Sequence, residues 1–333
     1  MRLRFFLAVM AGASAATAAP QRPIVIKFSH VVAVDTPKGR AAEFFQRRAR
    51  ELTGGRVEVE VYPDSTLYRD KEEIEALQLG AVQMLAPSLS KFGPVGVNEF
   101  EVFDLPFIFS DYDDLRKVTE GPVGKSLLQK LESKGLRGLA FWDNGFKAFS
   151  ASKPLRKLED YRGLKIRIQC SAVLDAQMRA LGALPQVMAF SEVYPALEAG
   201  VVEAAENPIS NIFTQRMHEV QKHIALTWHG YLGYAIVVNK RFWDGLPTDV
   251  RGELEQAMRE ATAYANRLAM EKNDQDLARL KAAGTTEVYA LTREERLALK
   301  KALIPVHGHM QGRIGKQLIQ SIYQATSFDP DAL

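Results

Sequence analysis

The fold is decided by a stretch that opens with Gly163-Leu164-Lys165-Ile166-Arg167-Ile168-Gln169 and closes with Glu206-Asn207-Pro208. Apolar and polar residues alternate in its opening, which predicts a β-strand with one apolar face turned inward and Arg167 on the other. In α/β folds the carboxyl ends of such strands face the ligand crevice, and a guanidinium grips a carboxylate through two parallel hydrogen bonds. Arg167 is therefore the first candidate for binding an anion. The alternative is a solvated polar face on an edge strand.

The first 18 residues have the composition of a secretory signal. Arg2 and Arg4 precede an apolar run and the small-residue cleavage pattern Ala16-Thr17-Ala18. We expect cleavage after Ala18, because cleavage one residue later would place Pro20 first in the mature chain. An uncleaved anchor is the alternative, although the apolar run is too short to span a bilayer.

Charge and cysteine content narrow the function classes. The 333 residues include 43 Lys plus Arg and 40 Asp plus Glu, a balance that argues against a nucleic-acid partner. Cys170 is the single cysteine, so an intramolecular disulfide is impossible despite the oxidising compartment that secretion implies. Folding must rest on the core, for which 47% hydrophobic residues are available, and the length predicts about two domains.

Strand and helix patterns alternate along the chain. Strand patterns at Ile24–Ser29 and Val57–Val61 flank a helical pattern at Lys38–Thr53, which Gly54-Gly55 ends. Further along, helices are expected at Lys71–Leu79, Asp111–Glu120 and Gly124–Lys134, an apolar stretch at Met84–Ala86 and a strand at Leu136–Trp142. This alternation predicts a mainly parallel sheet with helices covering its faces.

A faint internal repeat recurs after 120 residues. Ala76-Leu77, Gly80 and Val82 match Ala196-Leu197, Gly200 and Val202. In each copy a short helix ends at a glycine, and an apolar strand follows. A loop comes next, Pro87-Ser88-Leu89-Ser90 in one copy and Glu206-Asn207-Pro208 in the other. The repeat predicts two similar lobes that each direct one loop to a shared cleft, unless the identities are chance.

One helix is expected to be much longer than the others. Thr248 is the expected N-cap, the segment 249–283 lacks proline, and Gly284 is the expected stop. Its length of roughly 50 Å exceeds a single lobe, so we expect it to bridge both lobes. The expected apolar stripe is Leu254, Ala257, Met258, Ala261, Ala265 and Leu268. A coiled-coil dimerisation helix is the alternative, although the stripe is irregular for heptads.

Four cations stand at or near the boundaries of predicted elements: Lys38, Arg69, Lys147 and Arg167. Lys38 follows a turn into the first helix, whose amino-terminus attracts anions. Lys147 is expected just past the strand Leu136–Trp142. Taken singly, each of these residues fits a solvated surface charge better than an anion site.

Enzyme signatures are missing from the sequence. His218 and His223 are five residues apart and do not share a helical face. Neither this pair nor His307 with His309 has an acidic neighbour at zinc-site spacing. Cys170 lies near Arg167, whose positive charge would lower the thiol pKa, but it has no identifiable histidine partner and also fits as a small apolar filler. The sequence has no glycine-rich phosphate loop.

Several motifs together resemble the solute-binding proteins of TRAP transporters, across the whole mature chain. They include the opening stretch, Met188-Ala189-Phe190-Ser191-Glu192-Val193-Tyr194 and Glu206-Asn207-Pro208. Thr36-Pro37-Lys38-Gly39, Trp142-Asp143-Asn144-Gly145-Phe146-Lys147 and His229-Gly230-Tyr231-Leu232-Gly233-Tyr234 are similar to the C4-dicarboxylate-binding branch, the DctP type.

The resemblance implies a two-lobed, type II-like periplasmic binding protein of α/β class, with the ligand cleft between lobes and a long helix bridging them. It also implies delivery to a membrane permease driven by a sodium gradient. In the family, the residue matching Arg167 pairs with the ligand carboxylate, the residue matching Asn207 bonds near it, and the Phe190 position lines the pocket. Lys147 matches a second arginine of sialate-binding relatives, and Lys38 matches a cation of the dicarboxylate branch.

The sequence departs from the family pattern at two places that bear on the ligand. Ala204-Ala205 replace the usual Asp-Gly, which restricts the backbone. Cys170 stands where the dicarboxylate branch commonly has serine, which removes a hydroxyl from the pocket edge.

The expectation is a monomeric periplasmic protein that captures a small dicarboxylate such as succinate, malate or fumarate. Another organic acid, or an enzyme on the same scaffold, remains the alternative. The expected lobes are 21–144 with 233–272 and 145–232 with 273–333, after a signal peptide at 1–18. The expected ligand site, without metal or cofactor, comprises Arg167, Asn207, Lys38, Lys147, Ser88, Phe190, Asn144, Gln169, Arg69, Tyr234 and His30.

Overall fold

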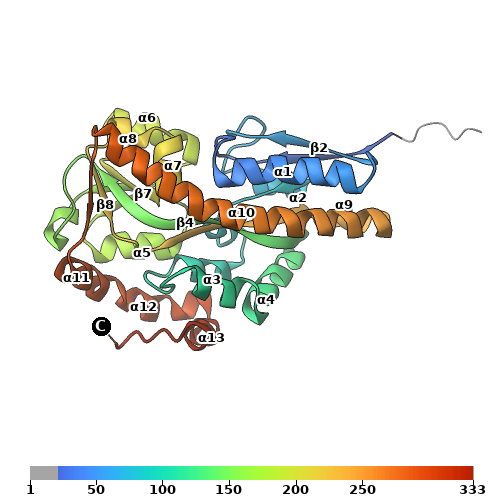
Figure 1. Ribbon diagram of the computed structural model, residues 1–333. Helices are drawn as coiled ribbons and strands as arrows, with labels where there is room; N and C mark the ends of the chain where they lie inside the picture. The colour runs from blue at the N-terminus through green and yellow to red at the C-terminus, as the bar shows by residue number, and fades with distance from the viewer. Residues whose placement is uncertain (1–21, 333) are drawn as a thin grey trace, which may run out of the picture.

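The computed structural model describes residues 22–332, so the expected signal peptide at 1–18 lies outside the described residues. Figure 1 shows two lobes joined by long central strands, with one helix running along both. Of the helices in the described part, not one combines the length and the apolar character needed to cross a membrane.

The strands are β1 (Ile24–Ser29), β2 (Val57–Tyr62), β3 (Met84–Leu85), β4 (Leu136–Ala151), β5 (Lys165–Ile168), β6 (Leu184–Val187), β7 (Ala204–Pro208), β8 (His223–Leu226), β9 (Tyr231–Asn239) and β10 (Glu287–Ala290). The α-helices are α1 (Pro37–Leu52), α2 (Glu73–Gln78), α3 (Tyr112–Thr119), α4 (Pro122–Lys130), α5 (Ala172–Ala180), α6 (Val193–Glu198), α7 (Ile209–Thr214), α8 (Met217–Val220), α9 (Lys240–Asp244), α10 (Thr248–Ala283), α11 (Arg293–Leu303), α12 (Pro305–Ile314) and α13 (Lys316–Thr326). Short 3₁₀ turns include η1 (Leu89–Phe92), η2 (Asn98–Asp104), η3 (Leu131–Lys134), η4 (Leu158–Tyr161) and η5 (Phe190–Glu192).

The strand order repeats itself in reverse about the centre of the sheet. The order is β2-β1-β3-β9-β4-β7-β5-β6, and β8 and β10 attach beside β4. In the first lobe β1 is parallel to β2 and β3, while β3 is antiparallel to β9. In the second lobe β5 is parallel to β6 and β7, while β7 is antiparallel to β4. The long antiparallel pair β4–β9 joins the two halves. The sheet is therefore mixed, and the prediction of a mainly parallel sheet is wrong in this respect.

The structure confirms the internal repeat in its backbone hydrogen bonds. The N–H of Ala81 donates to the carbonyl of Ala76 at 2.9 Å, and the N–H of Val201 donates to the carbonyl of Ala196 at the same distance. Gly80 and Gly200 end the two short helices with φ of 78° and 69°, a left-handed conformation that glycine adopts without strain. The two lobes are therefore built on the same local design.

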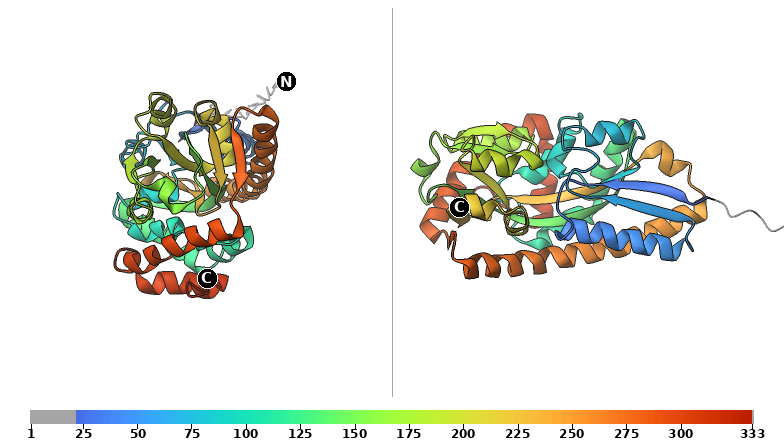
Figure 2. Two further views of the ribbon diagram at one scale, coloured as in Figure 1. Left: turned by 90° about the vertical axis from the view of Figure 1, so that its left-hand side faces the viewer. Right: turned by 90° about the horizontal axis from the view of Figure 1, so that it is seen from above.

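The bridging helix α10 runs along both lobes, as Figures 1 and 2 show. Its stripe is buried at five of the six predicted positions, whereas Leu268 is half-buried and Ala269 is buried instead. It packs on α1, β4 and α7 of the same chain. The predicted N-cap is wrong by one residue, because Pro247 precedes the helix and Thr248 is its first residue. Gly284 ends it with φ of 64°, as predicted.

The other predicted elements are confirmed with small shifts, but three placements are wrong. Lys147 lies inside β4 rather than past a strand, because β4 continues through an irregularity between Asp143 and Gly145. Asn207 lies within β7 rather than in a loop. The strand that carries Arg167 is internal, between β6 and β7, so the edge-strand alternative is also wrong.

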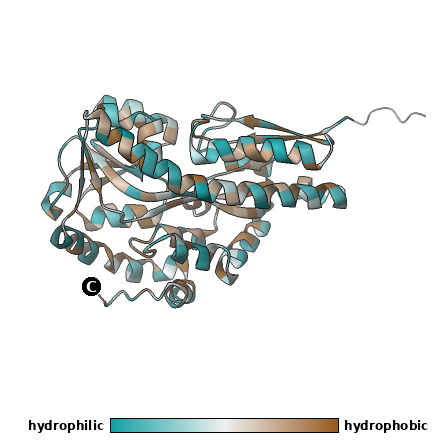
Figure 3. Ribbon diagram, in the orientation of Figure 1, coloured by the Kyte–Doolittle hydropathy of each residue, from teal (hydrophilic) through white to brown (hydrophobic). Residues whose placement is uncertain are grey.

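The C-terminal helices α12 and α13 pack against residues of the first lobe, although we expected them in the second. We assigned 273–333 to the second lobe, yet Val306 of α12 and Ile319 and Ile322 of α13 share a hydrophobic core with Phe100 and Leu115 near η2 and α3. Figure 1 shows α12 and α13 beside α3 and α4. The hydropathy colouring of Figure 3 shows hydrophilic and hydrophobic residues together on the outer helices, as expected for helices that cover a sheet.

Candidate functional site

A small cavity lies where the two lobes meet. Its volume is about 20 Å³, roughly the space of one water molecule. Six of the predicted site residues line it: Lys38, Ser88, Gln169, Phe190, Asn207 and Tyr234. They come from segments far apart in the sequence and from both lobes, so the fold brings together most of the predicted site.

Lys38 is held at the cavity by the start of α1. Thr36 caps this helix by accepting the N–H of Gly39 at 3.0 Å. A side chain at Gly39 would meet the carbonyl oxygen of Ala33 at 2.5 Å, so the turn requires glycine. The Lys38 ammonium donates to the carbonyl of Ala86 at 3.0 Å and lies 3.7 Å from the centre of the Tyr234 ring.

The environment of Lys38 disfavours its charged form. The side chain is buried, and burial lowers its pKa from 10.5 to about 7; nearby Glu73 opposes that shift and Lys91 adds to it. Lys38 forms no ion pair with any carboxylate among residues 22–332. The ammonium is therefore a buried donor that a ligand anion would stabilise.

Arg167 is the matching cation of the second lobe. It is 2% exposed, and its Nε and Nη2 donate to the carbonyl of Met188 at 3.2 and 2.9 Å. The guanidinium lies 5.8 Å from the centre of the Phe190 ring. Burial lowers the pKa of Arg167, while the charges of Asp70, Glu206 and Glu192 oppose that shift. Within 22–332 it has no ion-pair partner, and the carbonyl of Met188 orients it.

Amide groups surround the cavity on the second lobe. The side-chain oxygen of Asn207 accepts from the amide of Asn211 at 3.3 Å, and Asn211 also lines the cavity. Asn144 does not line the cavity but donates to the Tyr234 hydroxyl at 2.6 Å. Its oxygen accepts from the Ser210 hydroxyl at 2.8 Å. Asn144 thus positions Tyr234, whose ring faces Lys38.

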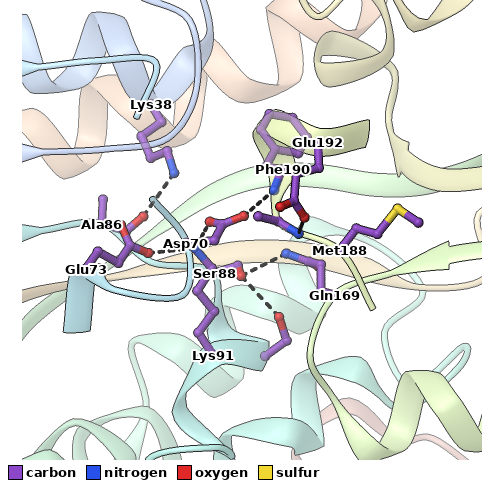
Figure 4. A network of polar contacts seen from close by, with 12 residues as sticks. Lys38, Asp70, Glu73, Ala86, Ser88, Lys91, Gln169, Met188, Phe190 and Glu192 are labelled. Atoms are coloured by element: carbon purple, nitrogen blue, oxygen red, sulfur yellow. Dashed lines mark hydrogen bonds and ion pairs between the residues drawn. The ribbon is translucent and has the colours of Figure 1, made fainter. Parts of the chain in front are cut away.

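Ser88 and Gln169 meet across the cleft. The Gln169 amide donates to the Ser88 hydroxyl at 2.8 Å, and the Ser88 and Ser90 hydroxyls are 3.1 Å apart. Figure 4 shows this contact beside the charged residues of the first lobe. Ser88 precedes η1 and Gln169 follows β5, so this hydrogen bond joins the two lobes directly.

Sequence reasoning missed two charged residues at the cavity, Asp70 and Lys91. The Lys91 ammonium pairs with the carboxylates of Asp70 and Glu73, the latter at 2.6 Å. Lys91 directly follows the predicted cleft loop Pro87-Ser88-Leu89-Ser90 and precedes Phe92. A charged residue at that place, next to apolar residues, could have been recognised as a candidate for the site. Asn211 was similarly visible four residues after Asn207.

Besides Asn144 and Arg167, three more predicted residues do not line the small cavity. Lys147 forms a buried ion pair with Glu206 at 2.7 Å, and Glu206 also meets His229 at 2.9 Å. Burial alone would raise the pKa of Glu206, but Lys147 and His229 lower it to about 2. Arg69 is exposed, and the next residue in the chain, Asp70, lines the cavity instead. His30 is buried and does not line the cavity, and burial lowers its pKa to about 3 and keeps it neutral.

A larger cavity of about 430 Å³ lies against the small one. Arg167 lines this larger cavity and not the small one, whereas Asp70, Lys91 and Gln169 line both. Cys170 is exposed there. The protein atoms packed around its thiol still shield it partly from water, and this desolvation raises the pKa of the thiol. The expectation that Arg167 lowers this pKa is therefore wrong, because Arg167 points its charge toward Met188. The thiol is also not a buried filler.

Residues 22–332 contain no cluster of histidine, cysteine and acidic side chains that could hold a metal ion. The cations and amides at the cavity are donors that suit an anion. The arrangement can bind a carboxylate but offers no nucleophile with a base.

Comparisons with known proteins agree with this geometry. The family model of bacterial extracellular solute-binding proteins, family 7, matches residues 28–313. The chain is 60% identical over 332 residues to the C4-dicarboxylate-binding periplasmic protein DctP of Rhodobacter capsulatus, covering 98% of this chain and 100% of that relative.

Solved structures share the fold over nearly the whole chain. A TRAP periplasmic solute-binding protein from Sulfurospirillum deleyianum, with bound succinate, has a TM-score of 0.89 and 44% identity, covering 92% of this chain and 100% of that chain. A TRAP periplasmic solute-binding protein from Pseudomonas aeruginosa, with bound L-malate, has a TM-score of 0.84 and 42% identity, covering 86% and 100%. The chain therefore belongs to family 7 of the bacterial extracellular solute-binding proteins, and it is a periplasmic solute-binding protein of the TRAP type, not an enzyme.

Proposed function

We propose that this protein captures a C4-dicarboxylate such as succinate, malate or fumarate and delivers it to a TRAP permease. One observation carries the proposal. Each lobe places one buried cation at the cleft, Lys38 or Arg167, and neither cation has a carboxylate partner within the described residues. A ligand with a carboxylate at each end supplies one partner for each.

The absence of a carboxylate partner for Lys38 and for Arg167, within the described residues, favours a ligand with two carboxylates. An unpaired buried charge costs several kcal/mol, on the order of the desolvation of an ion. Lys91 is not free to serve, because Asp70 and Glu73 already neutralise it. Lys147 is likewise paired, with Glu206, so it is not part of the proposed ligand site. Two cations then remain for two carboxylates.

The proposed ligand lies between the two halves of the repeat. Arg167 and Asn207 hold one carboxylate, and Lys38 with Ser88 holds the other. The cavity of about 20 Å³ is smaller than a four-carbon acid, so the lobes or the lining side chains must move for the ligand to enter. Closure follows binding because only the closed form lets both lobes touch the ligand. Relatives with bound succinate and L-malate support this ligand class.

The departures from the family pattern lie near Arg167 but outside the small cavity, because Ala205 pairs with Arg167 in the sheet and Cys170 lines the larger cavity beside it. Ala204 and Ala205 lie in β7 and pair with Ala151 and Ser150 of β4, and neither lines the small cavity. Cys170 lines only the larger cavity. We infer that they leave the recognition of two carboxylates intact.

Titration calorimetry tests the proposal on protein stripped of bound ligand by unfolding and refolding. Arg167→Ala is expected to weaken succinate binding by roughly a hundredfold or more, because a charge-assisted pair is lost in a desolvated site. The exposed Arg179→Ala serves as a matched control and should bind like the wild type. An Arg167→Ala variant that binds succinate and malate as tightly as the wild type would contradict the anchoring role.

A thermal-shift screen separates dicarboxylates from other acids. Succinate, malate and fumarate should raise the melting temperature more than monocarboxylates, oxo acids or aromatic acids of similar size. A larger shift with one of those acids would reassign the ligand. Delivery to a sodium-driven permease, a monomeric state, and the lobe boundaries near 144 and 232 are part of the same proposal.

A further inference from the structure

Asp70 makes a polar contact that crosses the cleft. One oxygen of its carboxylate accepts the backbone N–H of Phe190 at 2.5 Å, and the other oxygen holds the Lys91 ammonium. Asp70 precedes α2 of the first lobe, whereas Phe190 begins η5 of the second. Figure 4 shows the contact between the two lobes. Because the donor is main chain, the contact requires no particular side chain at position 190.

Both ends of this contact are held in place. Lys91 is fixed between Asp70 and Glu73, the latter buried in α2, so the Asp70 carboxylate has a defined position. On the other side, Glu192 accepts the N–H of Ala189 at 3.0 Å and fixes the start of the turn that carries Phe190. A contact between two rigid supports can stabilise one relative arrangement of the lobes.

Asp70 carries a negative charge next to the proposed binding site for an anion. Burial alone would raise its pKa, but Lys91, the N–H of Phe190 and Arg167 together lower it, so the carboxylate is ionised. A carboxylate beside the proposed anion site repels the ligand and, on charge alone, weakens binding. That cost is offset by the ion pair with Lys91 in the same lobe and by the N–H of Phe190, which the second lobe supplies.

We propose that Asp70 is a positioning residue that fastens the closed lobes together through the backbone of Phe190. The proposal rests on the proposed function for its ligand but not for the closure itself. A contact made only in the closed form shifts the equilibrium toward closure and so slows ligand release. Asp70 thus lowers the dissociation rate without acting as a ligand contact.

Two substitutions distinguish a role of Asp70 in fastening the lobes from a purely electrostatic effect of its charge on the ligand. Asp70→Ala removes the acceptor, so the dissociation rate of succinate in stopped-flow measurements should rise roughly tenfold or more, with a smaller change in the association rate. Asp70→Asn keeps an acceptor oxygen for the Phe190 N–H, so its dissociation rate should lie between those of Asp70→Ala and the wild type. If Asp70 acted through charge alone, both variants would bind succinate more tightly than the wild type.

Glu73→Gln is the matched control. It removes the other carboxylate of the Lys91 pair but keeps an acceptor oxygen and breaks no contact between lobes, so the dissociation rate should stay within about threefold of the wild type. The proposal is overturned if Asp70→Ala releases succinate no faster than Glu73→Gln, or if Asp70→Ala and Asp70→Asn behave alike.

Lobe separation tests the closure without any ligand. Spin labels at the exposed positions Arg50 on α1 and Glu198 on α6, in a Cys170→Ser background, report the distance between lobes. Asp70→Ala should shift the ligand-free distance distribution toward longer values, and Glu73→Gln should not. An unchanged distribution would overturn the proposal. A wild type that binds no acid would overturn the proposed function instead, because these distances still report on Asp70.

Discussion

Lys38 and Lys147 are both about 1% exposed, yet their ammonium groups meet different partners. Lys147 pairs with the carboxylate of Glu206 at 2.7 Å. Lys38 has only the carbonyl of Ala86 and the ring of Tyr234, and no carboxylate within 22–332. Burial alone therefore does not mark a ligand residue. The difference lies in whether the protein neutralises the charge itself or leaves it for a ligand.

The largest expected effect is on stability, at Lys147. Lys147→Met leaves the buried Glu206 with only His229, so the free energy of unfolding should fall by roughly 3–5 kcal/mol. Lys38→Met orphans no carboxylate and should leave that free energy unchanged or raise it. Urea denaturation of both variants checks this. Equal losses in the two variants would erase the distinction between the lysines.

The pH dependence gives a smaller effect, specific to Lys38. Its pKa is about 7 when folded and 10.5 in its ordinary state, so the unfolded chain binds more protons between these values and the Lys38 contribution to stability rises with pH across that window. A bound dianion favours the ammonium form. Succinate affinity should therefore fall above about pH 7, by at most about tenfold per pH unit.

Calorimetry in a pH series, with buffers of different ionisation enthalpy, measures both the affinity and the protons taken up on binding. Lys38→Met should lose the pH dependence between about pH 7 and 9, while Lys147→Met should keep it if it folds. A wild type whose affinity is flat over this range, with no proton uptake, would contradict the role of Lys38.

The smallest expected effect is on the residue that positions Tyr234 over Lys38. Asn144→Leu removes the donor to the Tyr234 hydroxyl, so succinate affinity should fall by about 1 kcal/mol, or roughly fivefold. Ser210→Ala removes the bond on the far side of Asn144 and should have a smaller effect. An Asn144→Leu variant with unchanged affinity would show that Tyr234 needs no such support.

The sequence predicted local features well because their causes are local. The alternation of valine with glutamate in Val57–Val61 marks its strand, and the segment Thr36-Pro37-Lys38-Gly39 carries its own helix cap, which places Lys38 correctly. The repeat and the glycine that ends α10 were likewise visible, because a left-handed turn selects glycine at that one position.

The pairing of charges was not predictable, because the partners are distant in the chain. Glu206 is 59 residues from Lys147, and the sequence around Lys147 does not indicate that Glu206 is its partner. The Asp143-Asn144-Gly145 segment has turn residues, so the strand was expected to end there, but β4 absorbs it as an irregularity. At Arg69 and Asp70 the error was one residue, because loop backbone has no periodicity that tells which side chain points inward.

The central claim is that Lys38 and Arg167 each bind one carboxylate of the same ligand. Calorimetry with succinate and its half-amide, succinamate, on the wild type and Lys38→Met tests it most directly. The wild type should bind succinate at least roughly tenfold more tightly than succinamate, and Lys38→Met should lose most of that preference, because the second carboxylate no longer meets a charge. A preference that survives unchanged in Lys38→Met would contradict the claim.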